Sequence, residues 1–175
     1  MRQLMSMDRS QLAAWEEGYQ QEIEHIESYL AIQKFRYGDK LEYSIEADKE
    51  LLSYRIIKII IQPIVENAIY HGIKKIPGTG RIDISIKEAD GNICITVADN
   101  GVGMDEETLK GLLDVNGHGS ISKGGIGVKN VDQRIKLYYG EEYGVHMESI
   151  VFEGTRVTLT MPKEYSKKEE THEKA

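Results

Sequence analysis

Cysteine is almost absent from the sequence, because Cys94 is the only one among 175 residues. A single thiol can form neither an intrachain disulfide nor a cysteine zinc cluster, which fits a reducing compartment. Long apolar runs are missing too: no run of about 18 apolar residues occurs, and the first ten residues lack the apolar core of a signal peptide. We therefore expect a cytoplasmic segment that makes no contact with a membrane.

The sequence also lacks an excess of positive charge. The formal net charge is -7, so no basic stripe is available to bind a nucleic acid. A small phosphate ligand stays possible, because backbone N-H groups and Mg²⁺ can hold phosphates without net positive charge. With 40% hydrophobic and 29% charged residues, the composition is that of a folded globular protein.

The length suits one compact domain and a short additional element. We assign residues 1–38 to an N-terminal helix, 39–162 to the domain and 163–175 to a disordered polar tail. The first helix is predicted by apolar residues spaced by threes and fours, with glutamates between them. These apolar residues are Leu12, Trp15, Tyr19, Ile23, Ile26 and Leu30.

Alternating apolar and polar residues predict strands at 41–46, 81–87, 92–98, 145–150 and 156–161. Asp90 and Gly91 favour a tight antiparallel hairpin between the second and third of these. Helices are predicted at 53–72, with a bend or a fresh start near Pro63, at a short segment capped by Asp105, and at 126–139. The order predicts an α+β fold, a two-layer sandwich with helices on one face of a mixed sheet, preceded by the N-terminal amphipathic helix.

Three stretches could each form one wall of a nucleotide pocket. In residues 62–72, helical spacing puts Asn67, Tyr70 or His71, and Lys74 on one face, and an amide oxygen suits Mg²⁺. Taken alone, this stretch also fits a buried helix with a polar edge.

The second stretch, residues 99–104, follows a strand. The Asp99 carboxylate could accept a hydrogen bond from the amine of adenine, and Gly101 and Gly103 allow close approach to a flat ring, although a plain turn is the alternative. The third, residues 117–130, is rich in glycine and ends at a helix start, where N-H groups can face phosphate. It lacks the lysine spacing of a P-loop and the third glycine of a dinucleotide fingerprint.

Together these stretches resemble the Bergerat ATP-binding fold shared by gyrase-type ATPases and sensor histidine kinases. Glu66-Asn67-Ala68 resembles its N box, Asp99-x-Gly101-x-Gly103 its first glycine box and Gly125-x-Gly127 its second. The motif at residues 62–72, Gln-Pro-x-Val-Glu-Asn-Ala-Ile-x-His-Gly, is similar to the corresponding motif of LytS-type and YesM-type kinases. The resemblance covers residues 10–162.

The resemblance implies that the domain binds ATP and Mg²⁺. Asn67 would hold Mg²⁺ and Asp99 the adenine amine, Thr155 would lie on the pocket floor, Glu66 could polarise a nucleophile, and residues 116–124 would form a lid. The full set of ATP-binding residues that we expect is Asn67, Tyr70, His71, Lys74, Asp99, Gly101, Gly103, Met104, Gly124, Gly125, Ile126, Gly127, Val128 and Thr155.

Three departures shape the expected activity. Members of the family often carry lysine at the position of Tyr70, so Lys74 or Lys75 could make the phosphate contact in its place. Pro63 stands where gyrase-type relatives carry the glutamate that activates water, so fast hydrolysis is not expected. The acceptor motif of the family is absent from this chain, so phosphate would go to an acceptor-histidine helix outside it and then to a response regulator. The resemblance also implies a homodimer in the full-length protein, a membrane-anchored sensor. A non-catalytic nucleotide-binding module and an anti-sigma-type serine kinase are the alternatives.

Overall fold

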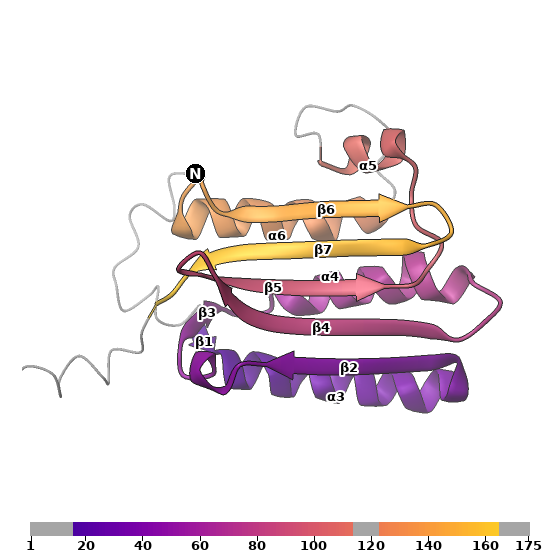
Figure 1. Ribbon diagram of the computed structural model, residues 1–175, viewed down its shortest axis with the longest axis horizontal. Helices are drawn as coiled ribbons and strands as arrows, with labels where there is room; N and C mark the ends of the chain where they lie inside the picture. Colours follow the sequence, from indigo (N-terminus) through magenta and orange to yellow (C-terminus); the bar gives the residue numbers. More distant parts are fainter. Residues whose placement is uncertain (1–15, 114–122, 165–175) are drawn as a thin grey trace, which may run out of the picture.

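The computed structural model describes residues 16–113 and 123–164, with only the backbone described for residues 16, 113 and 123–126. Its centre is a five-stranded sheet with the strand order β2-β4-β5-β7-β6 (Figure 1). The strands are β2 (Leu41–Ala47), β4 (Gly80–Ala89), β5 (Asn92–Asp99), β6 (Gly144–Ile150) and β7 (Gly154–Pro162). Only β2 and β4 are parallel, and the other neighbours are antiparallel, so the predicted mixed sheet is confirmed.

Helices cover one face of this sheet (Figure 1). They are α3 (Tyr19–Tyr37), α4 (Ile61–Asn67) and α6 (Lys123–Tyr139), whereas the short α5 (Glu106–Leu113) lies beyond the β6 edge. α4 continues into a π-helical turn, η3 (Ala68–Gly72), and a 3₁₀ turn, η4 (Ile73–Lys75). Two more 3₁₀ turns, η1 (Gly38–Lys40) and η2 (Lys49–Leu51), flank β2.

The core lies between the sheet and the helices, because every second strand residue points inward. Burial alternates along β4, β5 and β7, and the inward side chains are mainly isoleucine and valine. They pack against apolar side chains of the three helices. The fully buried contributors include Ile26 and Leu30 of α3, Ile64 and Val65 of α4, and Val128, Val131 and Ile135 of α6.

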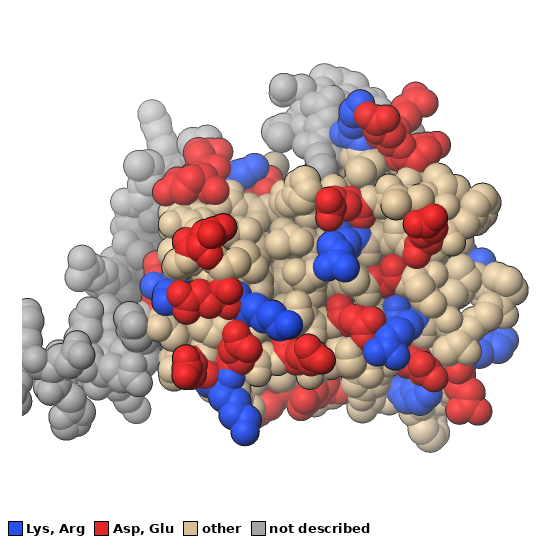
Figure 2. All heavy atoms as spheres, viewed as in Figure 1, with Lys and Arg blue, Asp and Glu red and all other residues tan. Residues whose placement is uncertain are grey.

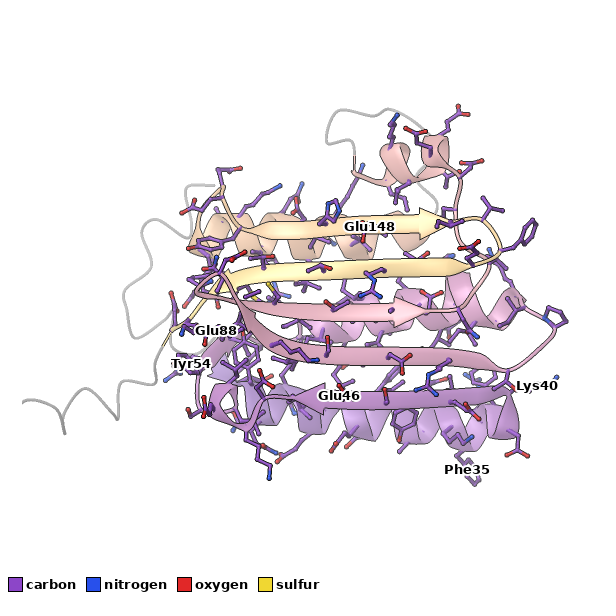
Figure 3. The ribbon with its side chains drawn as sticks, in the orientation of Figure 1. Phe35, Lys40, Glu46, Tyr54, Glu88 and Glu148 are labelled. Atoms are coloured by element: carbon purple, nitrogen blue, oxygen red, sulfur yellow. The ribbon has the colours of Figure 1, made fainter. Side chains whose placement is uncertain are left out.

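The opposite face of the sheet is open and carries charged side chains of both signs, including Glu46, Glu88 and Glu148 (Figures 2 and 3). Arg81 of β4 lies 3.7 Å from Glu42 of β2. Exposed pairs of this kind contribute about 0–1 kcal/mol each. The charged side chains keep this face of the sheet exposed to water.

Two helix predictions were wrong in their extent. Where a helix was expected from residue 12, residues Glu16–Gly18 form strand β1, and α3 begins only at Tyr19; residues 12–15 lie outside the described residues. Within the helix predicted at 53–72, residues Arg55–Ile57 form strand β3, which pairs antiparallel with β1. The apolar run in this region fits a buried strand as well as a helix, and pairing with β1 decides between them.

Other local predictions are confirmed. α4 starts afresh at Ile61, so Pro63 lies in its first turn, where the missing N-H is not needed. Asp105 Oδ1 accepts a hydrogen bond from the Thr108 N-H at 2.8 Å, as an N-cap does. α6 begins three residues earlier than the predicted residue 126. None of the described helices is both long enough and apolar enough to span a bilayer.

The predicted tail starts with two residues that are bound to the fold. Lys163 Nζ lies 2.8 Å from Glu88 Oε1, and the Glu164 carbonyl accepts a hydrogen bond from the Arg55 N-H at 2.8 Å. Residues 165–175 lie outside the described residues, so the disorder predicted for them stays a prediction.

Candidate functional site

A cavity of about 450 Å³ opens between the helical layer and the ends of β5 and β7. One wall is the segment from α4 to η4, the floor is formed by strand ends, and the opposite side by the loop of residues 100–105, α5 and the β6–β7 turn. The volume is in the range of small-ligand pockets, about 300–1,000 Å³. The lining residues are Ile64, Asn67, Ala68, His71, Gly72, Lys75, Val97, Asp99, Val102, Gly103, Met104, Asp105, Thr108, Leu112, Val151, Phe152, Thr155 and Val157.

Asp99 is the last residue of β5, and its carboxylate lies on the cavity surface. Oδ1 accepts a hydrogen bond from the Gly101 N-H at 2.8 Å. Burial raises the pKa of Asp99 to about 6, although hydrogen bonds from the backbone of Gly101 and Thr155 act in the opposite direction. At neutral pH the group is therefore mostly ionised, and it can accept a further hydrogen bond from a ligand.

Two glycines bring the helical wall against this carboxylate. A methyl group added at Gly72 would lie 2.7 Å from Asp99 Oδ1, and one added at Gly101 would lie 2.3 Å from the Gly72 Cα. Neither position has room for a larger residue without displacing neighbouring atoms. The Gly101 identified in the sequence thus acts through packing, since it does not line the cavity itself.

The cavity floor is tied together by hydroxyl groups. Thr155 Oγ1 and Ser149 Oγ lie 2.8 Å apart, and Ser149 Oγ accepts a hydrogen bond from the Met104 N-H at 2.8 Å. At Gly103 the backbone has a φ of +64°, in the left-handed region that favours glycine. The expected residues Gly103, Met104 and Thr155 therefore meet at one end of the cavity.

The helical wall presents residues at a spacing of four, namely Asn67, His71 and Lys75. Of the two residues expected at the middle position, Tyr70 and His71, the structure places His71 on the cavity, within a π turn, which takes more residues than an α turn. π turns are frequent at functional sites. Burial, and then the charge of Lys75, lower the pKa of His71 and favour its neutral form.

Tyr70 and Lys74 do not line the cavity, although both were expected at the site. Tyr70 is 49% exposed, and Lys74 Nζ lies 5.3 Å from the centroid of its ring. The structure thus turns this pair outward and brings Lys75 to the cavity in place of Lys74. Glu66 also lies outside the lining, and its Oε1 accepts a hydrogen bond from Gln62 Nε2 at 3.0 Å.

The second glycine box, Gly125-x-Gly127, lies in the first turns of α6 and not in a loop. Gly124, Gly125 and Ile126 have only their backbone described, and residues 114–122, which include most of the expected lid, lie outside the described residues. Gly127 faces Pro63, because a methyl group added at Gly127 would lie 3.8 Å from the Pro63 Cβ. Val128 is buried in the core, so its side chain does not reach the cavity.

The first turn of α4 is fixed from two sides. Glu22 of α3 is 1% exposed, and its carboxylate accepts hydrogen bonds from the N-H groups of Ile59, Ile60 and Ile61 at 3.1, 2.9 and 3.0 Å. Arg134 of α6 donates hydrogen bonds to the carbonyl oxygens of Lys58 and Ile59. These contacts supply partners that a helix N-terminus lacks within itself. They also fix the direction in which α4 carries Asn67 to the cavity.

Sequence reasoning missed several lining residues. Val151 and Phe152 come from the turn between β6 and β7, and Asp105, Thr108 and Leu112 from α5 and its cap. A signal for the turn was present, because large apolar residues are unusual in a hairpin turn: Phe152 is 86% exposed. The contribution of α5 depends on tertiary packing and had no local signal.

Comparison with known families and structures agrees with this geometry. Residues 53–165 match the family of histidine kinase-, DNA gyrase B-, and HSP90-like ATPases. The sensor histidine kinase YesM of Bacillus subtilis is 36% identical over 143 residues, which are 82% of this chain and 23% of the relative. The sensor histidine kinase YpdA of Escherichia coli is 36% identical over 141 residues, 81% of this chain and 24% of the relative.

Solved structures show the same fold. The catalytic domain of the histidine kinase ThkA, in a nucleotide-free form, aligns with a TM-score of 0.62 at 16% identity, covering 86% of this chain and 97% of that domain. The histidine kinase domain of a blue-light-activated kinase from Erythrobacter litoralis gives a TM-score of 0.58 at 17% identity, covering 83% of this chain and 61% of that one.

The chain spans about a quarter of the length of the sensor kinases that it matches. The matched residues 53–165 include Asn67 on the helical wall and the strand neighbours Asp99 and Thr155 on the floor of the same cavity. ATP is the nucleotide of this family. The chain therefore belongs to the histidine kinase-, DNA gyrase B- and HSP90-like ATPases, and it corresponds to the ATP-binding catalytic domain of sensor histidine kinases.

Proposed function

We propose that this domain binds ATP with Mg²⁺ in the cavity and transfers the γ-phosphoryl group to a histidine on a helix outside this chain. The observation that carries the proposal is the meeting of Asn67, Asp99 and Thr155 around one cavity. These residues come from three stretches far apart in the sequence. A carboxylate that accepts hydrogen bonds, an amide and the Lys75 ammonium are groups that could bind the adenine, the metal ion and the phosphates of ATP.

The adenine end of the proposed site is formed by Asp99 and its apolar neighbours. An ionised carboxylate accepts but does not donate, so it selects a ligand with an N-H donor, such as the exocyclic amine of adenine. Ile64, Val97 and Val157 line the same cavity and supply apolar surface for a flat ring. A guanine ring carries an oxygen at the corresponding position, and two acceptors facing each other would disfavour it.

The phosphate end is proposed to lie at Asn67, His71 and Lys75. An amide oxygen is a hard, neutral ligand, so Asn67 fits as a protein ligand for Mg²⁺, which keeps several waters. When bound, Mg²⁺ neutralises charge on the phosphate oxygens. Of Lys74 and Lys75, only Lys75 is among the described residues that line the cavity, and we assign the phosphate contact to its ammonium group.

In the proposed reaction a histidine nitrogen attacks the γ-phosphorus in line. The bond from phosphorus to the β–γ bridging oxygen breaks, and ADP leaves with that electron pair. The domain contributes position and charge stabilisation, and the attacking group comes from elsewhere. Pro63 lies in the first turn of α4, where it has no group that could activate water, so we expect slow hydrolysis.

The proposal extends to the longer protein. We place the domain in the cytoplasm, where ATP is available, and propose that the phosphohistidine passes its phosphoryl group to a response regulator. A homodimer is part of the proposal. The apolar side chains of Ile32 and Phe35 on α3 support it, because they are 65% and 93% exposed, and Figure 3 shows Phe35 pointing away from the domain.

Calorimetric titration with ATP and Mg²⁺ tests the site. We expect wild type to bind one ATP and Asp99→Ala to bind about 10- to 100-fold more weakly, since a hydrogen bond to a charged group contributes about 1.5–3 kcal/mol. Asp48→Ala, at an exposed aspartate just after β2, is the matched control and should bind as wild type does. Equal affinity of Asp99→Ala and wild type would contradict the adenine assignment.

Addition of a separate acceptor-helix fragment then tests the reaction. The proposal expects acid-labile phosphate on the histidine of the fragment and none on the domain itself. Acid-stable phosphoserine on an added partner would instead indicate a serine kinase. Tight ATP binding without any transfer to the fragment would indicate a regulatory module.

A further inference from the structure

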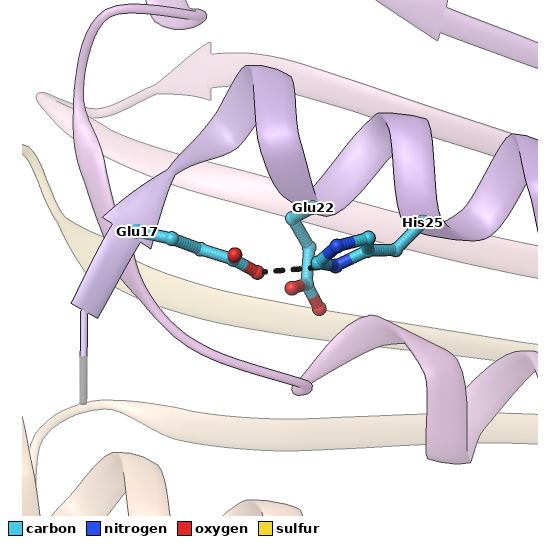
Figure 4. A group of neighbouring side chains, drawn as sticks. All are labelled: Glu17, Glu22 and His25. Carbon is cyan, nitrogen blue, oxygen red and sulfur yellow. Dashed lines mark ion pairs between the residues drawn. The ribbon is translucent and has the colours of Figure 1, made fainter. Parts of the chain in front are cut away.

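A second cluster of chemically capable side chains lies away from the cavity. Glu17 of β1 and Glu22 and His25 of α3 point toward one another (Figure 4). One ligand atom from each lies within 4.8 Å of those of the other two, and His25 Nδ1 is 3.6 Å from Glu17 Oε1. None of the three lines the ATP cavity, so the cluster takes no part in the function proposed above.

Glu17 is the member whose position needs an explanation. It is 8% exposed, and its Oε1 is buried without a hydrogen-bond partner. Burial raises the pKa of Glu17 to about 7, a hydrogen bond to Glu22 and the charge of Glu22 act in the same direction, and Lys58 lowers it. A buried carboxylate without a partner is strongly disfavoured, so this oxygen requires a cation, either a proton or a metal ion.

The nearest cationic groups, Lys58 and His25, make no hydrogen bond to Glu17 Oε1. Glu22 is held by three backbone N-H groups at the start of α4. Arg134 faces Glu22 but donates its hydrogen bonds to the Lys58 and Ile59 carbonyl oxygens. His25 is 58% exposed, which leaves its ring accessible to solvent and to an incoming ion.

We propose that Glu17, Glu22 and His25 bind a divalent transition-metal ion, with Zn²⁺ as the best match. Two carboxylate oxygens and one imidazole nitrogen form a three-ligand set that Zn²⁺ accepts, with water at the fourth position on the exposed His25 side. Mg²⁺ and Ca²⁺ prefer all-oxygen sites with six or more ligands, and they match this set less well.

The site would join three elements. Glu17 belongs to β1, His25 to α3, and Glu22 makes its hydrogen bonds to the first turn of α4. A metal ion here would therefore hold β1 and α3 against the helix that ends in Asn67. Its expected effect is on the stability of this junction, and ATP should still bind to the metal-free protein.

The test is titration of the metal-free chain with Zn²⁺, followed by calorimetry and thermal unfolding. We expect one site whose affinity falls at least about tenfold in His25→Ala, with a rise in melting temperature on Zn²⁺ addition that the variant loses. His146→Ala removes an exposed histidine of β6 and is the matched control; it should bind Zn²⁺ as wild type does. Because His25 is exposed, its replacement should leave the fold intact.

Two further measurements identify the ligands. Co²⁺ in place of Zn²⁺ should give visible absorption bands that are present in wild type and His146→Ala and lost in His25→Ala. Glu17→Gln should also weaken Zn²⁺ binding at least about tenfold, because an amide oxygen is a poorer zinc ligand than a carboxylate. Unchanged Zn²⁺ affinity in His25→Ala would overturn the proposal. So would a Glu17→Gln variant that is stabilised without metal while wild type binds none, since a shared proton then accounts for the cluster.

Discussion

The segment that runs from α4 to η4 has two ends of opposite character. At its start, the Glu22 carboxylate and Arg134 hold residues 58–61 by hydrogen bonds from both sides. At its far end, the helix widens into a π turn and presents Asn67, His71 and Lys75 to a cavity. The comparison shows how a binding wall is positioned: a closed, fully bonded end fixes the direction of a helix whose other end is left open for a ligand.

Replacement of Glu22 should have the largest effect on this arrangement. Glu22→Ala leaves three N-H groups at the start of α4 without a partner, and removing one side of a buried charged network costs about 3–5 kcal/mol. Denaturant unfolding measures the loss. Glu24→Ala, at an exposed position of the same helix, should change stability by less than about 0.5 kcal/mol. Equal effects of the two variants would remove the contrast between the two ends.

The pH dependence of ATP binding sharpens the contrast at the open end. The pKa of Asp99 is raised from 3.8 to about 6 by burial, so the carboxylate becomes protonated in the folded protein as the pH falls through 6. Below that point ATP affinity should drop by up to about tenfold per pH unit, because the protonated group is a poorer acceptor. Calorimetry between pH 5 and pH 8 on wild type and Asp99→Asn measures this, and the variant should lack the step that wild type shows.

The free energy of unfolding should rise as the pH falls below about 6, whereas ATP affinity should fall over the same pH range. Since the folded state binds the Asp99 proton more tightly than the unfolded state, the free energy of unfolding gains from this group as the pH falls from about 6 toward 3.8. A binding step and a stability gain of opposite sign, both removed by Asp99→Asn, identify Asp99 as their source. An identical pH profile in the variant would assign the binding step to another group.

A smaller difference is expected between the two lysines at the end of the segment. Lys75→Ala should weaken ATP binding by about tenfold, as for loss of one charge-assisted hydrogen bond to phosphate. Lys74→Ala should change it less than about twofold, because Lys74 lies over the exposed Tyr70 ring and outside the cavity. The reverse order in a titration would show that Lys74, one residue earlier in the turn, makes the phosphate contact.

The elements defined by local chemistry could be predicted from the sequence. Alternation in β4 and β5, the tight turn at Asp90 and Gly91, and the Asp105 cap depend on neighbours in the chain, and each was found. The residues of the site could be predicted in part. Asn67, Asp99 and Thr155 were identified through their motifs, and all three line one cavity. Their binding roles remain predictions until ATP is titrated.

The features that could not be predicted from the sequence depend on contacts between distant segments. The strand at Arg55–Ile57 exists because β1 pairs with it, and its apolar sequence alone fits a helix equally well. Lys74 and Lys75 could not be told apart from the sequence, because the π turn that precedes them changes which side chains share a face, and no residue type indicates such a turn. The close packing of Gly101 on Gly72, where an added methyl group would lie 2.3 Å from backbone, joins two segments that only the fold brings together.

The hydrogen bonds of Glu22 couple the position of α3 to that of α4. The helix has 19 residues and is therefore about 28 Å long. Its first turn is bonded to the start of α4 through the Glu22 carboxylate. Rotation of α3 about its axis would therefore displace residues 59–61, at the start of the segment that carries Asn67.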